Sequence, residues 1–143
     1  MNVFVDASVT IKWFVPDNET EDDADKAVQV FKAIQKASLS PVQPVHWQSE
    51  VIAVLSWIQV EQCKRSIQLL DVLEFPVCDN VEIYQLASEL AIKLNHHMFD
   101  TLYHAVAIQQ QACLITADKK YYRKAQALGS VLLLRDFQMV KMQ

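Results

Sequence analysis

The sequence contains a single glycine, Gly129, among 143 residues. Phosphate-binding loops need glycine so that backbone amides can approach the ligand closely, and tight hairpin turns need it for positive φ. The sequence therefore excludes nucleotide-binding loops of the Walker or Rossmann kind and argues against a sheet built from hairpins. If this protein acts on phosphate, it must use side chains or a metal ion.

The chain also lacks an excess of positive charge, a paired-cysteine motif and a long apolar segment. Its 13 Lys and Arg face 17 Asp and Glu, a net charge of −4, which argues against a broad basic face for nucleic acid. No apolar run approaches the roughly 20 residues of a membrane span, and the N-terminus does not resemble a signal peptide. We therefore expect a cytoplasmic protein without membrane contact. Its scattered cysteines are expected to be reduced and are given no role.

Short apolar runs alternate with longer helical patterns along one domain spanning residues 1–143, whose 52% apolar content suffices for a single core. Helices alternating with strands, without hairpin signals, predict a parallel α/β sheet wound by right-handed crossovers. An acidic stretch at 17–25 is interpreted as a solvated helix start. The expected strands are 2–6, 41–45, 75–78, 113–116 and 131–134, and the clearest helices are 7–15, 46–62, 63–73, 79–94, 98–111 and 119–128.

Several carboxylates follow predicted strands, where open parallel sheets bind their ligands. Asp6 comes directly after the first strand and Asp118 after the fourth, so both belong at the same edge. Each could also be an ordinary helix N-cap. Asp79 and Asp136 follow strands too, and the spacing alone does not decide which of the four converge.

Two further acidic residues lie on predicted helices. Glu50 falls on or beside the apolar stripe of helix 46–62, where a carboxylate is costly unless it is neutralised. Asp100 lies in the first turn of helix 98–111, where the helix dipole also favours it. Carboxylates gathered within a few ångströms cannot all stay ionised without a cation. An all-oxygen site suits Mg²⁺ or Mn²⁺ and not zinc.

Four short motifs around these carboxylates follow one another along nearly the whole chain. They are Val5-Asp6-Ala7-Ser8-Val9 followed by Lys12-Trp13-Phe14, Trp47-Gln48-Ser49-Glu50-Val51, Phe99-Asp100-Thr101-Leu102-Tyr103-His104-Ala105, and Leu114-Ile115-Thr116-Ala117-Asp118. In their order and separation the sequence resembles the PIN domains, specifically the small toxins of bacterial and archaeal toxin–antitoxin pairs.

The resemblance implies a three-layer α/β/α fold with a five-stranded parallel sheet in the order 3-2-1-4-5 and about seven helices. It also implies Mg²⁺- or Mn²⁺-dependent cleavage of RNA that leaves a 5′-phosphate, a homodimer, and an antitoxin as partner. The implied catalytic and metal-binding carboxylates are Asp6, Glu50, Asp100 and Asp118, with Ser8 and Thr116 as supporting hydroxyls.

A basic cluster just beyond Asp118 has two interpretations. By default it is a solvated helix face, but it is also the basic patch placed to hold an RNA backbone beside the expected cleavage site. Its members are Lys119, Lys120, Arg123 and Lys124, and Lys12 is a further candidate.

The sequence departs from the family pattern at a few positions. Ala53 stands where relatives often carry Asn, and His104 replaces a commoner apolar residue four positions after Asp100. We expect His104 to be packed and hydrogen-bonded, with a contact to Asp100 or a phosphate as the functional alternative. His96 and His97 are expected to be exposed loop residues.

Two other functions remain open at this point. A PIN-like module without activity could bind RNA or a protein. A phospho-acceptor receiver domain could use Asp6 and Thr116, but it would need adjacent acids after the first strand and a Lys after the last, where this chain has Ala7 and Arg135.

Overall fold

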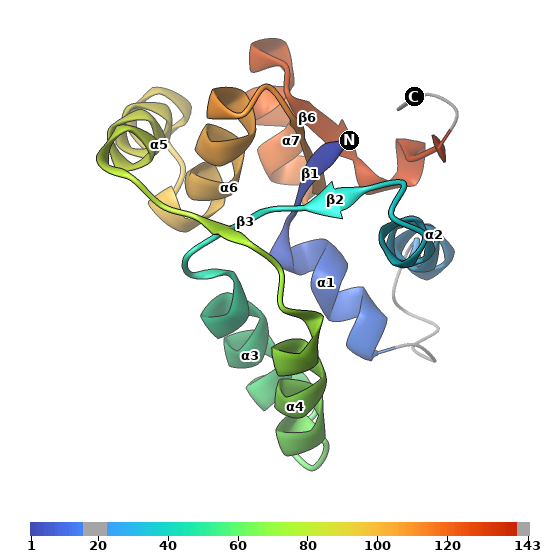
Figure 1. The fold of residues 1–143 in the computed structure, drawn as a ribbon. Helices are drawn as coiled ribbons and strands as arrows, with labels where there is room; N and C mark the ends of the chain where they lie inside the picture. The colour runs from blue at the N-terminus through green and yellow to red at the C-terminus, as the bar shows by residue number, and fades with distance from the viewer. Residues whose placement is uncertain (16–22, 140–143) are drawn as a thin grey trace.

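The computed structural model describes residues 1–15 and 23–139, and it places a parallel sheet between helices in three layers (Figure 1). The main sheet has four strands in the order β2-β1-β5-β6. All of its pairs are parallel, with Val3 opposite Cys113 and Leu114 opposite Val131. The strands are β1 (Asn2–Val5), β2 (Ser40–Pro41), β5 (Cys113–Thr116) and β6 (Val131–Leu133).

The expected second strand is present but divided. Its first part is β2, and its second part, β3 (Gln43–Pro44), pairs in parallel with β4 (Val77–Cys78). Followed through this break, the strand order is the expected 3-2-1-4-5. Proline lacks the N–H that a sheet ladder needs, so Pro41 and Pro44 prevent one continuous strand from forming.

The side chain of Gln43 bridges the gap between β3 and β1. It is completely buried, its Nε2 donates to the carbonyl of Val5, and its Oε1 accepts the amide of Val5, both at 2.8 Å. These are the hydrogen bonds that a neighbouring strand would have made. Gln43 therefore satisfies the buried backbone polar groups at the end of β1.

Seven α-helices lie in the part of the chain that the structure describes. Most match the predicted segments to within a few residues, although helix 46–62 ends four residues early, at Ile58. They are α1 (Ala7–Phe14), α2 (Ala24–Gln35), α3 (Trp47–Ile58), α4 (Cys63–Leu73), α5 (Val81–Leu94), α6 (Met98–Gln109) and α7 (Lys119–Ala125), with short 3₁₀ turns at Gln126–Leu128 and Leu134–Asp136. Most of the acidic stretch lies in residues 16–22, outside the described residues.

The two faces of β1 belong to different hydrophobic clusters, as the alternation of side chains along a strand requires. Phe4 packs into the larger cluster, which α3, α5, α6 and α7 build. Val3 and Val5 pack into a second cluster with α2 and Phe137. Coverage on both faces explains the unbroken apolar run of this strand. No helix in the described ranges is long and apolar enough to cross a membrane.

His104 is a packed core residue, as expected. It is fully buried, its Nδ1 lies 2.9 Å from the hydroxyl of Tyr121, and its Nε2 lies 2.8 Å from the carbonyl of Gly129. Burial lowers the pKa of His104, which favours the neutral imidazole. The residue ties α6 to α7 and to the Gly129 turn, where φ is +74°.

We predict that Gln43→Leu destabilises the fold by about 2–4 kcal/mol, because it leaves a buried N–H and a buried C=O of Val5 without partners. Urea denaturation measures this, with Gln85→Leu on the exposed side of α5 as the matched control. Equal stability of the two variants would show that Gln43 does not complete the sheet.

Candidate metal-binding site

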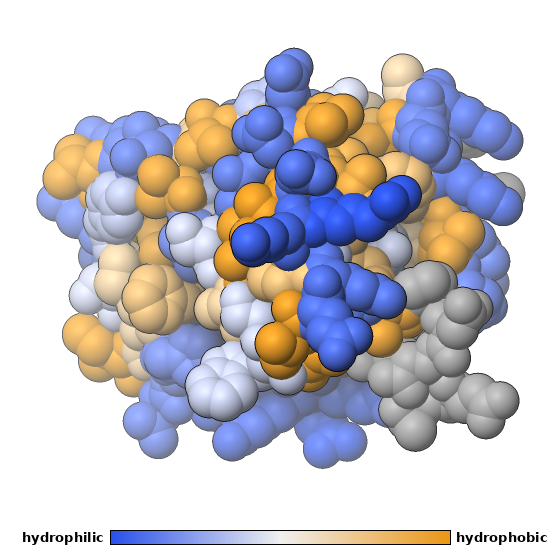
Figure 2. Space-filling model, turned by 90° about the horizontal axis from the view of Figure 1, so that it is seen from below, coloured by the Kyte–Doolittle hydropathy of each residue, from blue (hydrophilic) through white to orange (hydrophobic). Residues whose placement is uncertain are grey.

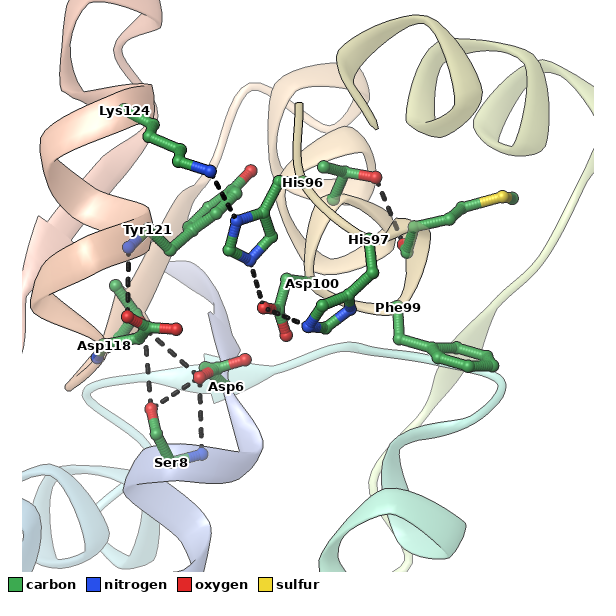
Figure 3. Close-up of polar contacts among 12 residues, drawn as sticks. Asp6, Ser8, His96, His97, Phe99, Asp100, Asp118, Tyr121 and Lys124 are labelled. Atoms are coloured by element: carbon green, nitrogen blue, oxygen red, sulfur yellow. Dashed lines mark hydrogen bonds and ion pairs between the residues drawn. The ribbon is translucent and has the colours of Figure 1, made fainter. Parts of the chain in front are cut away.

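Asp6 is fixed at the end of β1 by hydrogen bonds from two neighbouring segments. As N-cap of α1 it accepts the amide of Ser8 at 3.3 Å and also the Ser8 hydroxyl. The hydroxyl of Thr116, at the end of β5, donates to the same carboxylate oxygen at 3.2 Å. The parallel pairing of β1 with β5 thus places one carboxylate and two hydroxyls together at the carboxyl edge of the sheet (Figure 3).

Glu50 and Asp100 join Asp6 at this edge. Carboxylate oxygens of the three residues lie within 4.8 Å of one another. Glu50 comes from the first turn of α3 and Asp100 from the first turn of α6, so three segments far apart in the sequence meet here. The structure brings together three of the four carboxylates singled out in the sequence.

Asp118 lies beside this group without entering it. Its side chain caps α7 by accepting the amide of Tyr121 at 3.0 Å, and its own amide donates to the Thr116 hydroxyl at 3.1 Å. Since Thr116 also donates to Asp6, the two aspartates are joined through one hydroxyl. The second hydroxyl, Ser8 Oγ, accepts a hydrogen bond from the amide of Ala117 at 3.0 Å. This bond links the first turn of α1 to the residue after β5.

Histidines contact two of the three clustered carboxylates, which the sequence interpretation missed. Nε2 of His46 lies 3.0 Å from Glu50 and 2.9 Å from the carbonyl of Phe99. Nε2 of His96 lies 2.6 Å from Asp100, and that of His97 lies 3.1 Å from it. The i,i+4 spacing of His46 with Glu50 and of His96 with Asp100 is the signal that could have revealed these pairs.

The expectation that His96 is an exposed loop residue is wrong. Its side chain is only 8% exposed, because it packs between Asp100 and the ring of Tyr121, 4.9 Å away. The side chain of His97 is 64% exposed, as expected, although its Nε2 still reaches Asp100.

The clustered charges and their burial change the electrostatics of the site. The pKa of Asp6 is raised to about 7, chiefly by burial, with Glu50 and Asp100 adding to the rise and the Ser8 hydroxyl opposing it. The pKa of Tyr103 is raised by burial and by the same carboxylates, Glu50 first. Both shifts reflect burial first and the negative charge gathered at this edge of the sheet second.

A family model described as PIN domain matches residues 3–127. The chain belongs to the PIN domain family. Among curated proteins, none matches it by sequence.

Solved structures share the fold of this PIN domain at low sequence identity. A toxin–antitoxin complex from Klebsiella pneumoniae matches with a TM-score of 0.64 at 15% identity over 92% of this chain and 97% of that one. VapBC-1 from nontypeable Haemophilus influenzae matches at 0.62 and 20% identity, over 95% and 100%. PAE2754 from Pyrobaculum aerophilum matches at 0.60 and 15% identity, over 99% and 95%. PIN membership leaves no support for the receiver interpretation.

The side chains in this PIN domain fit a hard divalent cation. The donor set of Asp6, Glu50 and Asp100 is all carboxylate, which is what Mg²⁺ and Mn²⁺ prefer. The hydroxyl of Tyr103 is buried near these carboxylates, and among the described residues none accepts its proton. A cation with its water ligands would neutralise the carboxylates.

The basic residues proposed for RNA differ in accessibility. Lys119, Lys120 and Arg123 are exposed on α7. Lys124 reaches across to the carbonyl of Asn95 at 2.9 Å. Lys12 is only 8% exposed and offers little surface to a ligand.

We predict that Asp6 makes the metal-free protein less stable as the pH rises. Its folded pKa of about 7 lies above the ordinary 3.8, so its contribution is complete below about pH 4 and is lost as the pH rises through 7. In urea denaturation with EDTA, the wild type should lose about 2–4 kcal/mol relative to Asp6→Asn between pH 4.5 and 8.5. Mg²⁺ at pH 8.5 should restore the wild type and leave the variant unchanged. A pH-independent difference between the two proteins would contradict the prediction.

Proposed function

We propose that this PIN domain is a metal-dependent endoribonuclease and the toxin component of a toxin–antitoxin pair. The observation that carries the proposal is the meeting of Asp6, Glu50 and Asp100 oxygens within 4.8 Å, from three separate segments. PIN domains are generally nucleases that use divalent ions, and similar folds occur in structures described as toxin–antitoxin complexes.

The residues of the site divide into three tasks. Asp6, Glu50 and Asp100 would hold the cation, which when bound lowers the pKa of a water ligand and screens charge that develops on phosphorus. Ser8 and Thr116 keep Asp6 in its orientation through their hydroxyls. A carboxylate that does not bind metal is the better proton acceptor, and the position of Asp118 beside the cluster suits that task.

RNA is the proposed substrate, and the exposed basic residues of α7 are its proposed contact. Helix α7 begins at Asp118, directly beside the carboxylate cluster, so Lys119 and Lys120 lie close to where a scissile phosphate would bind. The RNA backbone is negatively charged and must bind next to an acidic pocket. Lysines beside that pocket supply the positive charge that attracts the phosphates. Hydrolysis by attack of a metal-activated water is expected to leave a 5′-phosphate.

An antitoxin and a second copy of this chain are the proposed protein partners. An apolar groove of about 550 Å³ lies between α1, α2 and α4, with Trp13, Phe31 and Val72 among its lining residues, and it offers a surface to an antitoxin segment. At the end of α3, Trp57 is 86% exposed, which suits a contact between copies. Figure 2, which views the molecule from below Figure 1, shows hydrophobic side chains at the surface between hydrophilic ones on that face.

We predict that Asp6→Asn lowers cleavage of a fluorogenic single-stranded RNA at least about 100-fold, because the cation loses a central ligand. Wild-type cleavage should require Mg²⁺ or Mn²⁺ and stop with EDTA. The matched control is Asp79→Asn, which also follows a strand but is exposed and lies outside the cluster. Binding of RNA by the wild type without any cleavage would instead identify an inactive RNA-binding module.

We predict that the double variant Lys119→Gln/Lys120→Gln weakens RNA binding about 10-fold without changing the rate of the bound complex. Two lost phosphate contacts should also reduce the slope of log affinity against log salt by about 1.4. Fluorescence anisotropy in the Asp6→Asn background measures the affinity and the salt slope, and cleavage by saturating enzyme with Asp6 intact measures the rate of the bound complex. The control is Lys32→Gln/Lys36→Gln at the end of α2, and an equal effect of the two pairs would remove α7 as the RNA contact.

A further inference from the structure

A second group of potential metal ligands lies next to the carboxylate cluster and differs from it chemically. It consists of His96, His97 and Asp100, whose ligand atoms all lie within 4.8 Å of one another. Asp100 belongs to both groups, so the two lie side by side. Two imidazoles and one carboxylate bind zinc-like transition metals far better than they bind Mg²⁺.

We propose that His96, His97 and Asp100 form a separate site for a divalent transition metal. The geometry supports this first. Both Nε2 atoms point at the same oxygen of Asp100, at 2.6 and 3.1 Å (Figure 3). Ligand atoms around tetrahedral zinc are about 3.3 Å apart, given bonds of about 2.0–2.1 Å, so the Asp100 carboxylate must draw back from the two imidazoles to admit an ion.

The placement of the two histidines also favours a metal site. Their rings lie 4.8 Å apart at 29°, so the two nitrogens approach Asp100 from neighbouring directions. His96 is largely buried while His97 is 64% exposed, which gives an ion a path from solvent and leaves room for a water ligand. Catalytic metal sites typically have three protein ligands and a fourth coordination position that is open to water or substrate.

Lys124 provides a way to distinguish a metal site from a structural hydrogen-bond chain. Its Nζ lies 3.4 Å from Nδ1 of His96 and donates there, so Nε2 of His96 carries a proton toward Asp100. Coordination through Nε2 requires the other neutral tautomer, so the proton moves from Nε2 to Nδ1 by exchange with water, without net release, and the contact with Lys124 ends. Lys124 therefore opposes metal binding, whereas it would support a purely structural chain from Lys124 through His96 to Asp100.

The test is titration of the full chain, free of Mg²⁺, with Co²⁺ and then with Zn²⁺ as competitor. Visible absorption of bound Co²⁺ and isothermal calorimetry report the site directly and do not depend on RNA cleavage. We expect a nitrogen-ligand absorption band from Co²⁺ in the wild type, displaced by Zn²⁺, in addition to any Co²⁺ that the all-oxygen carboxylate cluster takes up. Glu50→Gln, which removes a ligand of the carboxylate cluster only, should keep this band.

Variants of the histidines and of Lys124 decide the assignment. His97→Ala should weaken Co²⁺ binding at least about 10-fold and lose the band. Because the His97 side chain is exposed, this substitution should leave the fold intact, so unfolding would not account for lost binding. His46→Gln is the matched control, since His46 pairs with Glu50 and lies outside the group. Lys124→Ala should tighten binding.

Three results would overturn the proposal. They are a wild-type nitrogen-ligand band in His97→Ala, loss of that band in Glu50→Gln, and weaker Co²⁺ binding at that band in Lys124→Ala. Because these are binding measurements, failure of the nuclease assay leaves the assignment intact, and an active Mg²⁺ nuclease that does not bind Co²⁺ through His97 refutes the assignment alone.

Discussion

The repulsion among carboxylates at the end of β1 is the constraint on which the rest of this structure depends. Asp6 is almost completely buried, and Glu50 and Asp100 approach it within 4.8 Å. Burial and like charge together raise the pKa of Asp6 to about 7, so the fold holds this arrangement at a cost in stability near neutral pH. Core packing elsewhere must offset that cost, as is usual where an active site departs from the rules that stabilise a protein.

The parts of the fold and site that follow simple periodicity could be predicted from the sequence. The apolar run at residues 3–5 indicated a strand covered on both faces, and the two hydrophobic clusters cover it. Glu50 was a candidate because a carboxylate on an apolar helical stripe is energetically costly unless it is neutralised. The structure places it against two other carboxylates. Position after a strand was less informative, because Asp6 and Asp118 are both N-caps and only Asp6 joins the cluster.

Features that depend on side-chain hydrogen bonds could not be predicted in the same way. The break between β2 and β3 follows from two prolines, but its repair by the buried amide of Gln43 depends on a partner 38 residues away. The histidines were missed because a His beside a helix start has no periodic signature. Their i,i+4 relation to Glu50 and Asp100 carries meaning only once those carboxylates are known to matter.

The hydrogen bonds around the carboxylates indicate a site that is formed before any cation binds. Thr116 at the end of β5 and Ser8 in the first turn of α1 orient Asp6, and Nε2 of His46 lies against both Glu50 and the carbonyl of Phe99 in α6. None of these contacts requires a metal, so the ligands pay little conformational entropy when an ion arrives. A cation then competes with the proton that burial favours on Asp6. Metal affinity in such a site is governed by pH and not by folding, in contrast to small domains that fold only around their metal.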